Sequence, residues 1–222
     1  MPDPRTYQFN LSRARRPDDE VISETWYPGV RQYWPKCTSK RIVHPIDGVV
    51  AVVIHATAGA STAGAVSVMK SGTASFHWVV PDEDEQAHGQ LVWACVPETL
   101  AAWHVKRTMS HGDVNRGRTG ANDWSLGIEI VNTQSGAEPF SPWQVESTAK
   151  IVRYCWAKYP NLKHVVSHAK LDPKNRSDPG ANFPWDDFKR RVFAPAPAPF
   201  GRVASQVPPA GKLPSRKTLP CA

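Results

Sequence analysis

The sequence predicts an α/β fold, in which buried strands alternate with amphipathic helices along the chain. Residues 48–55 (GVVAVVIH) are rich in β-branched side chains and lack a polar face, which is typical of a central strand covered on both sides. Small and apolar residues recur at helical spacing over 61–71, and an apolar stripe runs along 142–159. With 222 residues, 41% of them hydrophobic, the chain is long enough for one globular core.

The elements follow in order. Residues 1–46 mix charge clusters with isolated aromatics and show no sustained period, so we expect an irregular N-terminal extension there. After the 48–55 strand, the 61–71 helix is expected to end at a Gly72 cap. Strands are expected at 76–80 and 90–96.

The strand predicted at 125–132 (SLGIEIVN) alternates cleanly. Leu126, Ile128 and Ile130 share one face, so Gly127 and Glu129 share the other. A carboxylate on that second face, beside a glycine that leaves room, is hard to explain as core. The alternative is a solvent-exposed strand glutamate.

The helix expected over 142–159 has strong boundary signals. Ser141 can cap it, Pro142 suits its first turn, Gln144 can complete a capping box, and Pro160 ends it. A short strand at 164–168 and a last helix at about 185–193 complete the folded domain, residues 47–193.

Charge divides unevenly along the chain. The net charge is +7, but the Pro- and Ala-rich tail of residues 194–222 holds four basic residues and no acid, which leaves +3 for the first 193 residues. A cationic tail without interleaved aromatics is weak support for a nucleic-acid partner, so none is expected. Contact between the tail and an anionic envelope is one hypothesis, and an inert end is the other.

Export and redox signals are few. No stretch approaches the roughly 18 apolar residues of a membrane span, and no signal peptide is visible, so we expect a chain without a transmembrane segment that is cytoplasmic on synthesis. The four cysteines are scattered without a Cys-x-x-Cys pair, which disfavours a zinc ribbon and predicts ordinary thiols. The histidines outside the motifs described below are expected at the surface: His44, His88, His111 and His164.

Three segments place a candidate metal ligand beside or just after a strand. They are VVIHAT with His55, VVSHAKLDP with His168, and NRSDPG with Asp178. Two imidazoles and one carboxylate fill three positions around zinc and leave a fourth open for water, which is the arrangement of hydrolytic zinc sites. Zinc would lower the pKa of that water and polarise a carbonyl.

The sequence resembles the type 2 N-acetylmuramoyl-L-alanine amidases, which include cytosolic muropeptide-recycling enzymes, phage endolysins and peptidoglycan-recognition proteins. The resemblance runs from about Val49 to Phe188, in family order, through VVIHAT, SFHWVV, AAWHV, NDWSLGIEIVN, VVSHAKLDP and RSDPGANFPW. It implies a mixed central β-sheet flanked by helices, with zinc in a groove on one face. The predicted strands and helices are compatible with that fold.

The resemblance also implies roles for individual residues. His55, His168 and Asp178 match the ligands of one zinc ion per chain, and Glu129 matches the acid that takes the attacking water's proton and passes it to the leaving nitrogen. Arg176 stands where many family members have a lysine whose charge can stabilise the oxyanion. The alternative for Arg176 is a surface residue paired with Asp172 or Asp187.

Four more residues match positions beside the family's groove and are expected to shape it or bind substrate: His77, Trp103, His104 and Asn122. Each has a plain alternative. The two histidines could be hydrogen-bonded structural residues, Trp103 a core aromatic, and Asn122 the cap of a turn.

The function implied is zinc-dependent hydrolysis of the amide bond between N-acetylmuramic acid and L-alanine in peptidoglycan or muropeptides. A lytic, endolysin-like role at the cell wall is preferred, and a cytosolic enzyme that recycles anhydro-muropeptides is the alternative. A non-catalytic peptidoglycan-binding module is the rival from another class. Such binders typically lack the full ligand set, which is present here.

Overall fold

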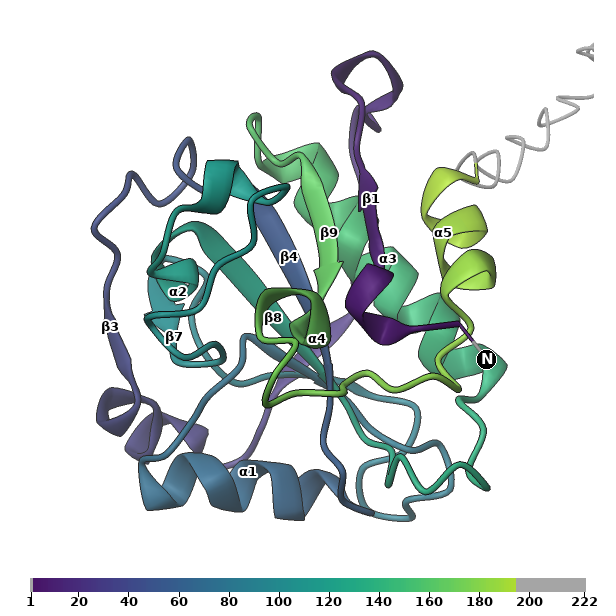
Figure 1. Ribbon diagram of the computed structural model, residues 1–222. Coiled ribbons are helices and arrows are strands. Elements are labelled where there is room, and N and C mark those ends of the chain that lie inside the picture. The colour runs from purple at the N-terminus through teal and green to yellow at the C-terminus, as the bar shows by residue number, and fades with distance from the viewer. Residues whose placement is uncertain (1, 195–222) are drawn as a thin grey trace, which may run out of the picture.

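The computed structural model describes residues 2–194, so the predicted tail beyond Ala194 lies outside the described residues. Its centre is a seven-stranded sheet in the order β1-β9-β4-β8-β5-β6-β2 (Figure 1). The four middle strands are mutually parallel, whereas β1 and β6 run antiparallel to their inner neighbours. The mixed central sheet is therefore confirmed. In sheet order the strands are β1 (Gln8–Asn10), β9 (His164–Ser167), β4 (Ala51–Ala56), β8 (Ser125–Ile130), β5 (Trp78–Val80), β6 (Val92–Ala94) and β2 (Glu24–Trp26).

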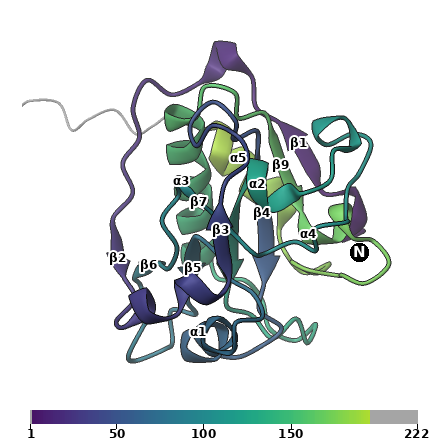
Figure 2. The same cartoon turned by 90° about the vertical axis from the view of Figure 1, so that its left-hand side faces the viewer.

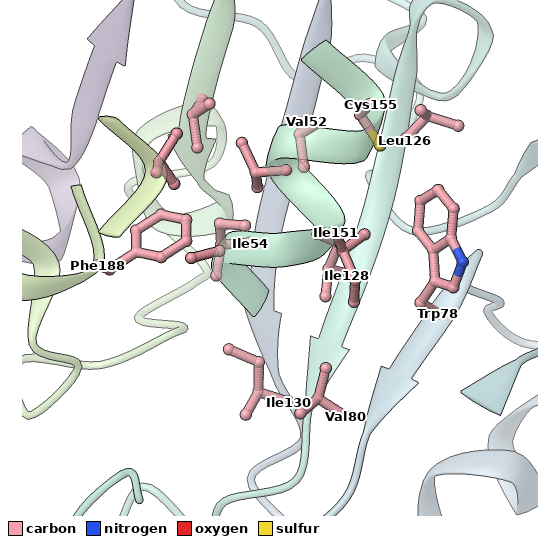
Figure 3. Close-up of a cluster of buried hydrophobic side chains, with 14 of the residues drawn as sticks. Val52, Ile54, Trp78, Val80, Leu126, Ile128, Ile130, Ile151, Cys155 and Phe188 are labelled. Carbon is pink, nitrogen blue, oxygen red and sulfur yellow. The ribbon is translucent and has the colours of Figure 1, made fainter. Parts of the chain in front are cut away.

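One face of the sheet is covered by α3 (Pro142–Lys158), with α5 (Trp185–Phe193) packed beside it (Figure 1). The strands present alternate side chains to this layer, as the pleat requires. Figure 3 shows Ile54 of β4 and Ile128 of β8 beneath Ile151 of α3, all of them fully buried. The alternation predicted for β8 is confirmed, because Leu126, Ile128 and Ile130 all belong to this core.

The opposite face has two smaller coverings. The helix α1 (Thr62–Ser71) packs near β5 at one end of the sheet (Figure 2). The loop that leads into α2 (Ala121–Trp124), together with α4 (His168–Leu171), covers the other part. This second face carries Val53 and His55 of β4 and, across the pair, Gly127 and Glu129 of β8.

The helix boundaries follow the capping signals. Ser61 accepts a hydrogen bond from the Gly64 amide at the start of α1, and Gly72 ends the helix with a φ of 76°. Ser141 and Gln144 form the reciprocal capping box of α3. These predicted boundaries are confirmed.

Residues 2–46 contain only short elements, as the missing period predicted, but they are integral to the fold. β1 and β2 form the two edges of the main sheet, and β3 (Thr38–Lys40) pairs with β7 (Leu100–Ala102) in a separate two-stranded sheet. Tyr7, Phe9 and Leu11 are buried in the main core. Short 3-10 helices connect these parts: η1 (Pro4–Thr6), η2 (Arg13–Arg15), η3 (Val30–Gln32), η4 (Trp34–Lys36) and, later in the chain, η5 (Asn115–Gly117).

The structure corrects one prediction about the histidines. The surface position predicted for His164 is wrong: the residue begins β9, is 6% exposed, and its Nδ1 lies 2.9 Å from Oδ1 of Asn10 on the paired strand β1. No helix within residues 2–194 is both long enough and apolar enough to span a membrane.

Candidate metal centre and groove

The candidate ligands meet because their strands are neighbours. His55 lies near the end of β4 directly opposite Glu129 of β8. On the other side of β4, Ile54 pairs with Ser167 of β9, so His168 begins α4 one position further along, beside His55. Asp178 comes from the loop after α4, where its carbonyl accepts a hydrogen bond from the Ala169 amide. The ends of the parallel strands β4 and β9 therefore bring together His55 and His168, which are 113 positions apart in the sequence, and the loop after α4 adds Asp178.

The three donor atoms form a compact buried cluster. Nδ1 of His55 lies 3.0 Å from Nδ1 of His168 and 3.2 Å from Oδ2 of Asp178, and Nδ1 of His168 lies 3.0 Å from the same oxygen. Donors placed about 2.0–2.1 Å from one tetrahedral zinc ion lie roughly 3.3 Å apart. Chemistry and spacing of this set both fit a single zinc ion.

The state of His55 also suits a ligand. Burial, together with the neighbouring His168, lowers the pKa of His55 to about 4. The imidazole is therefore neutral at pH 7, and neutral imidazole is the form that binds metal.

Glu129 stands beside the cluster with its side chain on the groove face of β8. Burial raises the pKa of its carboxyl well above the usual value, and the charge of Asp178 adds to this, while Arg176 opposes it. A carboxyl with a raised pKa beside a possible metal site is suited to taking up and returning a proton. The solvent-exposed strand glutamate considered as the alternative does not describe this position.

A cavity of about 680 Å³ opens over the cluster. Its wall includes all three donors, Glu129, His104 and Arg176, and its far side is formed by α1 and the segment that follows it. Arg176 is exposed, and among residues 2–194 it forms no ion pair. Asp172 instead accepts from Asn175, and Asp187 pairs with Arg190 and Arg191, so the surface ion pair considered as an alternative is not formed.

A second cavity of about 540 Å³ continues from the first, and His104 and Arg176 line both. Trp103 lies in its wall with 41% of its surface exposed, which excludes the core-aromatic alternative. Lys106 and Arg107 add exposed positive charge there. The groove is therefore cationic and partly aromatic beyond the metal cluster.

Asn122 also reaches this second cavity, and its side-chain amide forms three hydrogen bonds inside the protein. Its Oδ1 accepts from the amides of His104 and Val105, and its Nδ2 donates to the Val105 carbonyl at 2.9 Å. The residue holds the backbone that carries His104. This geometry gives Asn122 a structural role, and the predicted substrate contact stays a prediction.

His77 does not line either cavity, and here the predicted substrate contact gives way to the structural alternative. It is fully buried, its Nδ1 accepts from the Gly127 amide at 2.9 Å, and its Nε2 faces the Leu100 carbonyl at 3.1 Å. Nε2 also lies 3.0 Å from Nη2 of Arg41, so both ring nitrogens contact protein atoms. Burial and the nearby Arg41 hold the pKa of His77 well below its usual value.

Arg41 is a residue of this region that sequence reasoning missed. Its guanidinium is 5% exposed and donates to four backbone carbonyls, those of Glu98, Asn122, Asp123 and Ser125, at 2.9–3.0 Å. Burial lowers its pKa to about 10. It fixes α2 and the start of β8, and hence the strand that presents Glu129. A single arginine in a segment without a period gives no signal of this role.

His104 is the remaining predicted groove residue. Its ring reaches the cavity wall, but both ring nitrogens face protein atoms: Nδ1 lies 3.0 Å from Nε2 of His55, and Nε2 lies 3.3 Å from Oγ of Ser125. The ring lies against Gly127, where a Cβ atom would meet Cγ of His104 at 2.7 Å. The room beside Gly127 thus accommodates His104.

Fold and donors together define an α/β domain with a potential site for one metal ion. Comparison with known proteins identifies the family. The chain belongs to the N-acetylmuramoyl-L-alanine amidase family, whose model matches residues 45–181, more than half of the sequence.

Individual relatives agree with this family. The chain is 30% identical over 149 residues to the N-acetylmuramoyl-L-alanine amidase AmiD of Escherichia coli, covering 63% of this chain and 52% of AmiD. It is 30% identical over 94 residues to the 1,6-anhydro-N-acetylmuramyl-L-alanine amidase AmpD of Enterobacter cloacae, covering 42% of this chain and 46% of AmpD. The chain thus spans about half the length of these curated relatives.

Solved structures share the fold. AmpDh3 from Pseudomonas aeruginosa in complex with anhydromuramic pentapeptide superposes with a TM-score of 0.58 and 27% identity, covering 69% of this chain and 64% of AmpDh3. AmiD from E. coli in complex with the substrate anhydro-N-acetylmuramic acid-L-Ala-D-gamma-Glu-L-Lys gives a TM-score of 0.56 and 29% identity, covering 68% of this chain and 60% of AmiD.

Proposed function

We propose that this chain hydrolyses the amide bond between the lactyl group of N-acetylmuramic acid and L-alanine in muropeptides, with one zinc ion held by His55, His168 and Asp178. The observation that carries the proposal is the cluster of three donors with Glu129 on the adjacent strand, all lining one cavity. Zinc in this site would polarise the scissile carbonyl and activate a water molecule.

The protein groups have separate tasks in this proposal. Glu129 takes the proton of the attacking water, for which its raised pKa suits it, and returns the proton to the alanine nitrogen as the amide bond breaks. Arg176, on the wall of the same cavity, offers a fixed positive charge to the developing oxyanion. The presence of the whole set favours catalysis over a non-catalytic binding module.

Two solved relatives and the second cavity support soluble anhydro-muropeptides as the substrate class. AmpDh3 and AmiD were solved with anhydromuramic peptides, and both are between 25% and 30% identical to this chain. The second cavity suits such a ligand, because Trp103 offers a flat apolar face to a sugar or peptide and Lys106 and Arg107 offer charge to peptide carboxylates. The endolysin-like role, and the contact between the C-terminal tail and an anionic envelope, stay hypotheses.

One assay separates these substrates. Purified protein is incubated with zinc and either a soluble anhydro-muropeptide or intact sacculi, and release of the stem peptide is measured. The proposal predicts faster release from the soluble substrate. Release from sacculi alone would favour the lytic role, and release from neither would refute the amidase assignment. Trp103→Ala, with Trp26→Ala as an exposed tryptophan control remote from the groove, tests the contribution of the second cavity.

A further inference from the structure

We propose that His104 positions a metal ligand. In this proposal, a hydrogen-bond relay from Ser125 through His104 fixes the tautomer of His55, so that Nδ1 of His55 presents a lone pair to the other two donors. The inference deepens the proposed function, since the zinc ion of that function is the ion that His55 would bind. His104 is a positioning residue in this account, because it acts through His55.

The relay begins at a backbone carbonyl. Oγ of Ser125 lies 2.6 Å from the carbonyl oxygen of Ala121, and a carbonyl can only accept a hydrogen bond. The hydroxyl proton of Ser125 is therefore committed to Ala121. The lone pairs of the same Oγ remain, so at the 3.3 Å contact with His104 the serine accepts and Nε2 of His104 donates.

The next step follows from the ring chemistry of histidine. A neutral imidazole carries one proton, so His104 with its proton on Nε2 has a lone pair on Nδ1. That Nδ1 lies 3.0 Å from Nε2 of His55, which must then be the donor. His55 accordingly carries its proton on Nε2 and a lone pair on Nδ1.

The lone pair of His55 points at the other two candidate ligands. Oδ2 of Asp178, at 3.2 Å, is a carboxylate oxygen, and Nδ1 of His168 lies at 3.0 Å. The lone pair of His55 and the Asp178 oxygen repel each other in this buried site unless a proton on Nδ1 of His168, which lies 3.0 Å from the same oxygen, or a cation lies among them. The relay thus prepares His55 for a metal ion before the ion arrives.

Two further observations make the arrangement specific. The His104 ring is 7% exposed and rests on Gly127, so the ring has little freedom to turn away from His55. His168 has no comparable support, since its buried Nε2 has no hydrogen-bond partner among residues 2–194. Partners that orient a ligand histidine typically change metal affinity by about 10- to 100-fold when mutated.

The test measures zinc affinity, by competition with a chromogenic chelator, in the full-length protein. His104→Leu removes both ring nitrogens and should weaken zinc binding about 10- to 100-fold. His104→Asn should recover part of this loss, because an amide oxygen near the Nδ1 position can accept from His55. Ser125→Ala should weaken binding less than His104→Leu does, and Ser39→Ala, a serine at the rim of the second cavity, serves as the matched control.

The double variant of His104→Leu and Ser125→Ala should bind zinc as weakly as His104→Leu alone, because both changes break one relay. Zinc affinity within twofold of wild type in both His104→Leu and Ser125→Ala, with normal circular dichroism, would overturn the relay and leave the proposed function intact. Additive losses would also overturn it. A wild-type protein that binds no zinc would refute the metal assignment itself, whereas zinc binding without amidase activity would refute only the proposed reaction.

Discussion

Replacing Gly127 with alanine probes the contact between β8 and His104. The added Cβ would lie 2.7 Å from Cγ, 2.9 Å from Nδ1 and 3.0 Å from Cδ2 of the His104 ring. Carbon atoms in contact prefer separations of about 3.5–4.0 Å, so the ring or the strand must shift by roughly 1 Å. The strand is held between β4 and β5, and the ring between His55 and Ser125.

Overpacking of this kind typically lowers the free energy of unfolding by about 1–3 kcal/mol. Displacing the ring should also weaken zinc binding, because the hydrogen bond to His55 lengthens. Urea unfolding of the metal-free protein and zinc titration measure the two effects. Gly112→Ala is the control, because a Cβ there meets nothing within 4 Å. An unfolding free energy within about 0.5 kcal/mol of wild type, the range of neutral surface changes, together with unchanged zinc affinity would refute the reasoning.

Three further predictions concern catalysis and metal. Glu129→Gln should keep its fold and its zinc ion but lose about 10²- to 10⁴-fold in kcat, because an amide does not accept the proton of the attacking water. Activity within about threefold of wild type would mean that another residue is the base. Arg176→Ala should lower kcat about 10²- to 10³-fold at constant zinc occupancy. Arg176→Lys should recover part of the lost kcat, because it restores the positive charge. An unchanged kcat in the alanine variant would show that Arg176 does not stabilise the oxyanion. Removal of metal by chelation should abolish activity, and stoichiometric zinc should restore it, with about one zinc per chain by elemental analysis; full activity after exhaustive chelation would contradict the zinc site.

The parts of the fold that the sequence predicts are those with a long local signal. The apolar run of β4, the alternation of β8 and the capping box of α3 each involve several residues that all favour one structure. The same holds for the site. His55, His168 and Asp178 each sit in a distinct motif, the two histidines at the ends of predicted strands and Asp178 in the polar loop after the second strand, and the structure brings them together.

What the sequence did not predict depends on contacts between distant segments. β1 and β2 are three residues long, too short for any period to appear, and their strand conformation comes from pairing with β9 and β6. The same reason explains His77 and His104: whether each binds substrate or supports the site depends on Arg41 and Ser125. His164 was misplaced because its partner Asn10 is 154 positions away.

The measurement that tests the central claim most directly is hydrolysis of an anhydro-muropeptide in water enriched with ¹⁸O, followed by mass spectrometry of both products. Attack of water on the lactyl carbonyl predicts one ¹⁸O atom in the carboxylate of the sugar fragment and an unlabelled stem peptide that begins with a free L-alanine amine. Label in a carboxylate of the peptide, or an intact bond between the lactyl group and alanine, would contradict the account.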